Sequence, residues 1–196
     1  MAEILILYYS RNGRTAELAN EIRQGVILET NCTAKIRTVP PIGSEKKTVP
    51  EAGPPYIRKR ELAECDGLAL GSPTRFGNMA APIKYFLDST SDLWVSGSLI
   101  NKPAAVFTSS SSMHGGQETT LMSMMLPLLH HGMLLVGVPY SEVALHLTQT
   151  GGTPYGASHF DGNKGLPLST EEIQVARTLG RRLAEPSKKM CGVASP

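Results

Sequence analysis

Short apolar runs recur along the chain, separated by segments of mixed polarity. Residues 4–9, 66–72, 103–109 and 134–140 are rich in apolar and small residues, which is typical of strands buried on both faces of a sheet. Residues 32–39 instead alternate, with Lys and Arg between apolar positions, and this predicts a less buried strand at a sheet edge. Five strands are therefore expected.

Helical periodicity occupies the intervals between these strands. Apolar residues recur at helical spacing over 15–28, a second helix is expected to end near residue 87, and a third is predicted over 117–131. A last helix begins after the capping-box pair Ser169 and Glu172. Because strands and helices alternate, the sequence predicts a three-layer α/β/α fold with a five-stranded parallel sheet, right-handed crossovers and helices on both faces.

Three stretches are expected to lack regular structure. Residues 40–60 are rich in Pro and Gly and predict a surface loop. Residues 141–168 form a segment longer than such a fold needs, so we expect it to form a pocket wall or a subunit contact. We interpret residues 1–185 as one domain and residues 186–196 as a flexible tail, and we expect Pro127 to kink or restart its helix.

Composition excludes several classes of function. The formal charge is only +2, from 19 basic and 17 acidic residues, so the chain is not expected to bind nucleic acid. No apolar run is long enough to span a membrane, and a strand begins almost at Met1, so we expect a cytoplasmic protein without membrane insertion. The three cysteines form no CxxC pair, and neither HExxH nor GxSxG occurs, so neither metal nor hydrolase chemistry is expected.

The loop after the first predicted strand has the features of a phosphate-binding turn. It offers hydroxyl groups, consecutive backbone N–H groups and the start of a helix. It lacks the GxGxxG and GxxxxGK[ST] patterns, so a single terminal phosphate is a better ligand than a pyrophosphate or a triphosphate. An ordinary capped turn is the alternative. This first loop consists of Ser10, Arg11, Asn12, Gly13, Arg14 and Thr15.

The loops after the third and fourth strands point to the same ligand site. In the second loop, backbone groups can reach the edge of a flat heterocycle and Arg75 can stabilise an anionic reduced ring, although a solvated arginine is the alternative. The third loop is rich in hydroxyl groups and glycine, and a flexible linker is its alternative. All three loops follow strands at one end of the predicted sheet, where α/β folds bind ligands. The second loop contains Pro73, Thr74, Arg75, Phe76 and Gly77, and the third contains Ser109, Ser110, Ser111, Ser112, Met113, His114 and Gly115.

Three further residues are candidates for a site. His130 and His131 end a predicted helix, where a histidine can act as a helix-terminal cation, a hydrogen-bonded core residue or a ring contact. Trp94 is the only tryptophan and fits either a buried core or the wall of a stacking pocket. Spacing alone leaves these alternatives open.

Four separated motifs are similar to those of a known family. They are LYYS at 7–10, GSPTRFGNM at 71–79, HHGM at 130–133 and GGTPYGA at 151–157. Together they resemble the WrbA family of NAD(P)H:quinone oxidoreductases, in order over residues 3 to about 184. The resemblance implies a flavodoxin-like fold with strand order 2-1-3-4-5, non-covalent FMN, NADH or NADPH as electron donor, two-electron reduction of quinones, and a homotetramer or dimer.

The same resemblance implies roles for matching residues. Residues 10–15 would bind the FMN phosphate, residues 74–76 would line the isoalloxazine, and residues 109–115 would form the third FMN loop. His130 would contact the flavin region, and Trp94 would belong to the substrate pocket, across a subunit boundary.

Two positions depart from the family pattern. Asn12, a candidate substrate contact together with Trp94 and His130, stands where the family often has Tyr, so an aromatic contact to nicotinamide or quinone is expected to be missing. The third loop is one residue longer over 108–114. We expect these departures to affect substrate preference more than FMN binding.

The expected function is transfer of two electrons from NAD(P)H to a quinone, by a ping-pong cycle at one flavin site. No side chain then needs to be a nucleophile, since the cofactor supplies the redox chemistry. The alternatives are a one-electron carrier that docks on redox proteins and a flavodoxin-fold interaction protein with weak or no activity. The balanced charge argues against the carrier, because carriers that dock electrostatically benefit from a face with one sign of charge.

Overall fold

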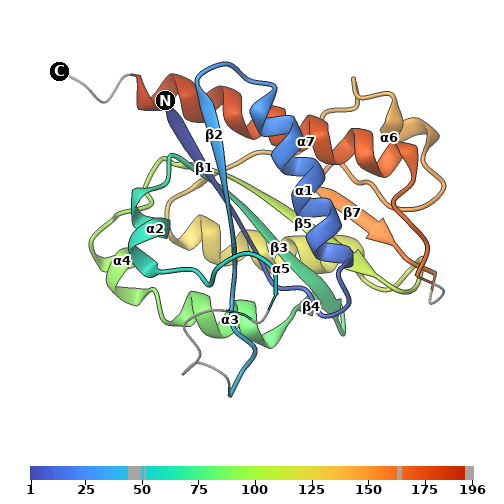
Figure 1. Cartoon of the computed structure of the whole chain (residues 1–196), viewed down its shortest axis with the longest axis horizontal. Helices are drawn as coiled ribbons and strands as arrows, with labels where there is room; N and C mark the ends of the chain where they lie inside the picture. Colours follow the sequence, from blue (N-terminus) through green and yellow to red (C-terminus); the bar gives the residue numbers. More distant parts are fainter. Residues whose placement is uncertain (44–49, 51, 163–164, 193–196) are drawn as a thin grey trace.

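A computed structural model of the chain describes residues 1–43, 50, 52–162 and 165–192. Its central sheet runs in the order β2-β1-β3-β5-β6, and all these strands are parallel (Figure 1). This confirms the predicted flavodoxin-like α/β fold, whose order 2-1-3-4-5 counts the same five strands along the chain. The strands are β1 (Ala2–Tyr8), β2 (Cys32–Thr38), β3 (Gly67–Arg75), β5 (Pro103–Ser110) and β6 (Leu134–Leu135).

The fifth position of the sheet differs from the prediction. β6 pairs only with the start of β5, and β7 (Ala157–Phe160) pairs in parallel with the last four residues of β5. The single strand predicted over 134–140 is therefore wrong beyond Leu135. The Val136 N–H still donates to the Ala104 carbonyl oxygen of β5 at 2.7 Å, but the Val138 N–H donates to the Pro154 carbonyl oxygen at 2.9 Å instead of to the sheet. Residues 136–156 are an insertion that divides one sheet position between two strands.

Helices cover both faces of the sheet (Figure 1). α1 (Arg14–Ile27) and α7 (Thr170–Cys191) cover one face, and α2 (Lys59–Glu64), α3 (Ala81–Asp88) and α5 (Gln117–His130) cover the other. Two short helices, α4 (Ser91–Val95) and α6 (Ala144–Leu147), were not predicted. α2 begins inside the predicted 40–60 loop, of which residues 44–49 and 51 lie outside the described part of the chain.

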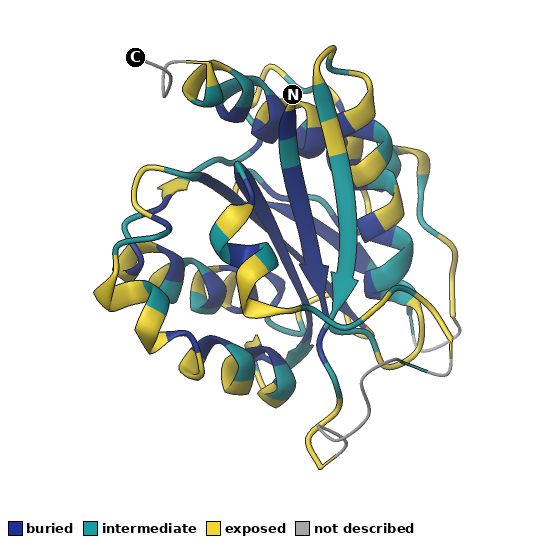
Figure 2. Cartoon of the chain, turned by 60° about the vertical axis from the view of Figure 1, so that its left-hand side comes forward, coloured by how far each residue is buried: buried dark blue, intermediate teal, exposed yellow. Residues whose placement is uncertain are grey.

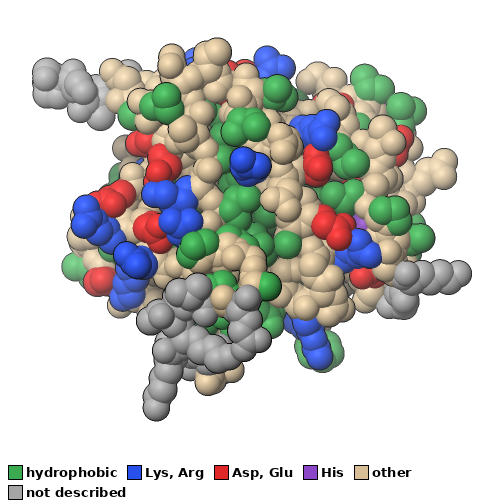
Figure 3. Space-filling model, viewed as in Figure 1, with side chains coloured by type: hydrophobic (Ala, Val, Ile, Leu, Met, Phe, Trp, Pro, Cys, Tyr) green, Lys and Arg blue, Asp and Glu red, His purple; other side chains and the backbone are tan. Residues whose placement is uncertain are grey.

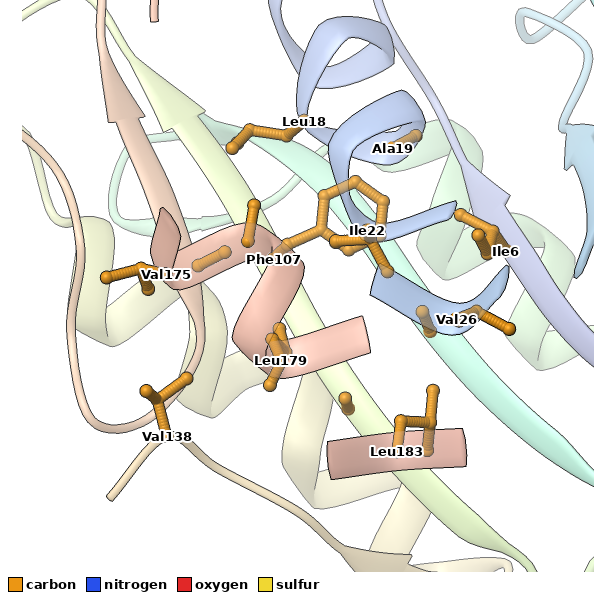
Figure 4. Close-up of a cluster of buried hydrophobic side chains, with 14 of the residues drawn as sticks. Ile6, Leu18, Ala19, Ile22, Val26, Phe107, Val138, Val175, Leu179 and Leu183 are labelled. Atoms are coloured by element: carbon orange, nitrogen blue, oxygen red, sulfur yellow. The ribbon is translucent and has the colours of Figure 1, made fainter. Parts of the chain in front are cut away.

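Each face of the sheet has its own apolar core. The α1/α7 core contains Phe107 among side chains from both helices (Figure 4). These helices can approach closely because Gly25 and Gly180 have no side chain. An added Cβ on Gly25 would be 2.0 Å from the Arg177 carbonyl oxygen, and one on Gly180 would be 2.1 Å from the Ile22 carbonyl oxygen. Figure 2 shows that β1 is mostly buried and β2 is partly exposed, which confirms the predicted sheet edge.

Two expectations for the helices are corrected. Residues 186–191 are not a loose tail, because α7 continues through Pro186 to Cys191 and the Ser187 side chain is fully buried. Pro127 does not restart its helix, because α5 is continuous from Gln117 to His130. The predicted capping box is confirmed: Ser169 Oγ accepts the N–H of Glu172, and the Glu172 carboxylate accepts the N–H of Ser169. Among the described residues, no helix combines the length and apolar character needed to cross a membrane.

Candidate functional site

A small polar pocket of about 90 Å³ lies at the carboxyl ends of β1, β3 and β5. It brings together residues from all three loops that the sequence singled out. The other candidates, Gly13, Phe76, Gly77, Ser112 to Gly115, Trp94 and His130, are not part of its lining. The lining residues are Ser10, Arg11, Asn12, Arg14, Thr15, Pro73, Thr74, Arg75, Ser109, Ser110, Ser111 and Asp161.

The first loop leaves the start of α1 without a side-chain cap. Gly13 is the N-cap residue with φ 90°, and its N–H group donates to Ser10 Oγ at 3.1 Å. Among the described residues, no side chain accepts from the first turn of α1, whereas Ser169 caps α7. Helix N-termini carry unpaired N–H groups and a partial positive charge, so α1 offers an anion-binding end beside the polar pocket.

The third loop is held to the first by buried hydroxyl groups. Thr15 Oγ1 lies 2.8 Å from Ser109 Oγ, and this contact is buried. Ser110 Oγ donates to the Ser112 carbonyl oxygen and accepts from Gln117 Nε2 at 3.0 Å. Because these polar groups are already paired behind the pocket, the loop is fixed before any ligand binds.

The second loop is a hairpin rather than an irregular segment. β3 continues to Arg75, which pairs with Asn78 of β4 (Asn78–Met79), so Phe76 and Gly77 form a two-residue turn. Both have positive φ, 53° and 72°, as a type I′ turn requires, and this is costly for a phenylalanine. The Phe76 side chain is fully exposed at the tip of the hairpin. Such strain on an exposed aromatic residue marks a position of functional interest.

The hairpin tip packs directly against the third loop. An added Cβ on Gly116 would be 2.7 Å from Gly77 Cα, so glycine is required for this approach. Thr74 Oγ1 donates to the Gly115 carbonyl oxygen at 3.2 Å and lies 2.7 Å from Thr120 Oγ1. The two loops therefore form one continuous wall.

A fourth wall of the polar pocket was missed by the sequence analysis. Asp161 lines the pocket directly after β7, and its N–H donates to the Ser110 carbonyl oxygen at 3.0 Å. Arg14 also donates to the Gly165 carbonyl oxygen in this segment. No sequence signal placed Asp161 here, because its position depends on β7 joining β5 from a distant part of the chain.

A buried carboxylate anchors this fourth wall. Glu172 is 1% exposed and accepts the N–H groups of Gly151, Phe160 and Ser169 at 2.7, 3.0 and 2.8 Å. His159 Nδ1 lies 2.8 Å from Glu172 Oε2. Burial raises the pKa of Glu172, but these hydrogen bonds outweigh burial and hold the pKa below its usual value.

A larger, mostly apolar cavity of about 780 Å³ adjoins the polar pocket. Arg11 and Arg75 line both spaces. Phe76 lines the larger one, so this predicted residue lies near the site but outside the polar pocket. The apolar side chains of this cavity include Tyr9, Ile42, Met79, Pro82 and Tyr85, none of which the sequence analysis proposed as a site residue, although Tyr9 and Met79 lie in its motifs. A flat aromatic molecule fits walls of this composition.

Trp94 and His130 lie together in a third cavity, of about 410 Å³, between α3, α4 and α5. This chain therefore does not bring them to the polar pocket. His131 lines the same cavity, and its Nε2 lies 3.0 Å from Thr90 Oγ1. Burial, with a smaller effect of His130, lowers the pKa of His131. Trp94 is 56% exposed, which excludes the buried-core alternative within this chain.

The arrangement fits a phosphate ester joined to a flat ring. The polar pocket offers an uncapped helix start and hydroxyl groups on Ser10, Thr15 and Ser109. The larger cavity next to it supplies aromatic and aliphatic walls. Both spaces lie at the switch point of the sheet, between β1 and β3, where flavodoxin-like folds bind ligands.

Comparison with known proteins gives close relatives over almost the whole chain. A family model described as NADPH-dependent FMN reductase matches residues 3–146. A protein from Solidesulfovibrio magneticus named NAD(P)H dehydrogenase (quinone) is 41% identical, covering 95% of this chain and 98% of its own length. A protein of the same name from Trichlorobacter lovleyi is 39% identical, covering 97% and 99%.

Solved structures show the same fold. A flavodoxin, WrbA-like protein from Agrobacterium tumefaciens has a TM-score of 0.70 at 21% identity, covering 96% of this chain and 99% of that one. A flavodoxin from the domain Archaea has a TM-score of 0.62 at 19% identity, covering 95% and 99%. At these identities the likeness concerns the fold alone.

Proposed function

This chain belongs to the NADPH-dependent FMN reductase family, and we propose that it is an FMN-dependent NAD(P)H:quinone oxidoreductase that transfers two electrons by a ping-pong cycle at one site. One observation carries the proposal: the phosphate-sized polar pocket opens beside an aromatic-lined cavity, and Arg11 and Arg75 line both. The names of the two bacterial relatives indicate NAD(P)H as the donor and a quinone as the acceptor.

The residues around the two spaces divide the binding of FMN between them. Residues 10–15 would hold the phosphate with backbone N–H groups and hydroxyls, and Ser109 to Gly115 would close the pocket. Pro73 to Gly77 would position the ring edge, with the Arg75 guanidinium beside it. When bound, FMN would supply the redox chemistry, hydride acceptance from the nicotinamide and two-electron transfer to the quinone. The protein's part is to fix the ring, set the local charge and leave an apolar space for each substrate in turn.

Surface charge supports an enzyme over an electron carrier. Figure 3 shows acidic and basic side chains interspersed over the face that it presents. Many charged residues of the described chain form ion pairs, such as Arg177 with Glu21 at 2.7 Å and Arg181 with Glu29 at 2.9 Å. A carrier that docks electrostatically needs a face with one sign of charge.

We also propose a homodimer or homotetramer in which the α4/α5 surface is covered by another copy. This surface carries Trp94, Val95, Leu126 and Leu129, which are 56%, 78%, 62% and 52% exposed. Exposed apolar side chains gathered on one face mark an interaction site. Such packing would place Trp94 and His130 at a subunit boundary, where they can complete a neighbouring substrate pocket.

Anaerobic visible spectroscopy tests the function. Purified protein supplied with FMN should show bound flavin that bleaches in a single two-electron step with NADH or NADPH and recovers with a benzoquinone. Steady-state kinetics should then give parallel double-reciprocal lines. Reduction in two separate one-electron steps would instead favour the carrier, and failure to bind FMN would favour an interaction protein.

A matched pair of variants tests the phosphate site. Ser10→Ala removes a hydroxyl from the polar pocket and should weaken FMN binding about tenfold, as expected for one hydrogen bond to a charged group. Thr33→Ala removes a hydroxyl near the amino-terminal end of β2, at the opposite end of the sheet, and should leave FMN affinity unchanged. Equal affinities for the two variants would contradict the assignment of the pocket.

A further inference from the structure

Arg11 has an unusual position among the basic residues of this protein. It is exposed, and it lines both the polar pocket and the larger apolar cavity. Within the described part of the chain, neither Arg11 nor Arg75 has a carboxylate at ion-pair distance. Two unpaired guanidinium groups therefore face the junction of the two spaces.

Neighbouring charges do not cancel this local excess. In the larger cavity, Lys84 pairs with Asp88 at 2.6 Å, so these two residues neutralise each other. In the polar pocket, Arg14 is paired with Glu17 at 2.7 Å. Asp161 lines the polar pocket but not the larger cavity. The larger cavity consequently keeps a net positive charge from Arg11 and Arg75, and a concave surface focuses such a field.

The two arginines are held differently. Arg75 donates from Nη1 to the Thr74 carbonyl oxygen at 2.7 Å, which fixes its guanidinium beside the hairpin. For Arg11, no hydrogen bond of the side chain to another described residue is present, so all its N–H donors remain available for a ligand. A planar guanidinium with free donors suits phosphate, sulfonate or carboxylate groups.

We propose that Arg11 determines substrate specificity, by binding an anionic group on the aromatic substrate that shares the larger cavity with the flavin ring. This inference rests on the proposed function. It adds a role for the Arg11 side chain that is separate from the backbone of the first loop, which faces the phosphate. The anionic group has two possible sources, the 2′-phosphate that distinguishes NADPH from NADH and an acidic substituent on the quinone. Both present the same chemistry to the guanidinium.

Two pairs of ligands distinguish the sources in the full-length, FMN-loaded protein. The first pair is NADP⁺ and NAD⁺, with dissociation constants measured by equilibrium dialysis. The second is a naphthoquinone with a propionate side chain and its methyl ester, compared by kcat/KM. Arg11→Gln should reduce the preference for the anionic member of one pair by about five- to tenfold, the size of one charge-assisted contact near the surface. The pair that changes identifies the source.

The controls separate a local contact from a change of net charge. Arg23→Gln removes the same charge from an exposed position on α1 that lines neither space, and it should leave both preferences unchanged. Arg11→Glu should lower the affected preference further, and raising the salt concentration should weaken the preference of the unmodified protein. Unchanged preferences in Arg11→Gln, or equal changes in Arg23→Gln, would overturn the role of Arg11. Failure of the unmodified protein to bind FMN, visible in its spectrum, would instead overturn the proposed function and this inference with it.

Discussion

The two helical layers of the molecule differ in how completely the chain itself covers them. On one face of the sheet, α1 and α7 approach through Gly25 and Gly180 so closely that neither position has room for a methyl group. On the other face, α4 and α5 leave Trp94 and Leu126 more than half exposed, above a cavity of about 410 Å³. The first layer is completed within one chain, whereas the second leaves apolar side chains exposed.

This difference bears directly on the site. The α1/α7 layer supplies the rigid part of the site. Residues at the start of α1 line the polar pocket, and Glu172 at the start of α7 accepts the N–H of Phe160, which directly precedes Asp161 of the fourth wall. The layer that contains α4 and α5 carries Trp94 and His130, two candidate residues that do not line the polar pocket. We therefore propose that the cofactor is bound within one chain and that the substrate pocket is completed by assembly.

The largest effect on stability is expected when the α1/α7 layer loses the buried carboxylate of Glu172. Glu172→Ala removes the acceptor of three backbone N–H groups and leaves His159 buried without its partner. We expect a loss of about 3–5 kcal/mol in the free energy of unfolding, measured by urea denaturation at neutral pH. Glu171→Ala, at the adjacent and partly exposed position, should change it by less than about 0.5 kcal/mol. Similar losses for the two variants would show that the network does not anchor this layer.

The same carboxylate predicts a pH dependence. Because hydrogen bonds hold the Glu172 pKa below its usual value, the folded state gains stability from the ionised form at pH values above the unfolded-state pKa. That contribution declines as the pH falls through the lowered pKa. Urea denaturation from pH 7 to pH 3 should therefore show a steeper loss for the unmodified protein than for Glu172→Gln, which cannot titrate. Parallel curves would contradict the prediction.

A smaller loss is expected from Gly180→Ala. Its Cβ would be 2.1 Å from the Ile22 carbonyl oxygen, so α1 and α7 must separate. Overpacking of this kind costs about 1–3 kcal/mol in the free energy of unfolding. Gly192→Ala is the matched control at the end of the same helix, because its Cβ would be 3.7 Å from the Lys188 carbonyl oxygen, an ordinary contact. A stable Gly180→Ala variant would show that the two helices do not need their close approach.

Substitutions on the α4/α5 surface should change the oligomeric state rather than the stability of the subunit. Leu126→Glu places a charge on the exposed side of α5 and should dissociate the oligomer, as measured by analytical ultracentrifugation. The free energy of unfolding of the isolated subunit should change by less than about 0.5 kcal/mol, because Leu126 is 62% exposed. Leu28→Glu, at a 69% exposed position after α1, should leave the assembly intact. A monomeric unmodified protein would contradict the proposed oligomer.

Local patterns predicted most of the fold. The apolar runs identify β1, β3 and β5 correctly, because strands buried on both faces need continuous apolar sequence. Ser169 and Glu172 predict the start of α7 from their spacing alone. The predictions fail where contacts with distant residues determine the structure. Residues 136–140 have the apolar character of a strand, but the Val138 N–H donates to the Pro154 carbonyl oxygen of the inserted segment.

The candidate site divides in the same way. By itself, the amino-acid sequence determined the strand-loop-helix units, the three loops rich in hydroxyl groups and glycine, and the resemblance to a flavin-binding family. Tertiary structure alone decided that Asp161 forms a fourth wall, that Phe76 stands exposed on a strained turn, and that Trp94 and His130 lie in a separate cavity. The physical reason is that hydrophobic period and capping act within a few residues, whereas these positions depend on β7 joining β5 and on packing between distant helices.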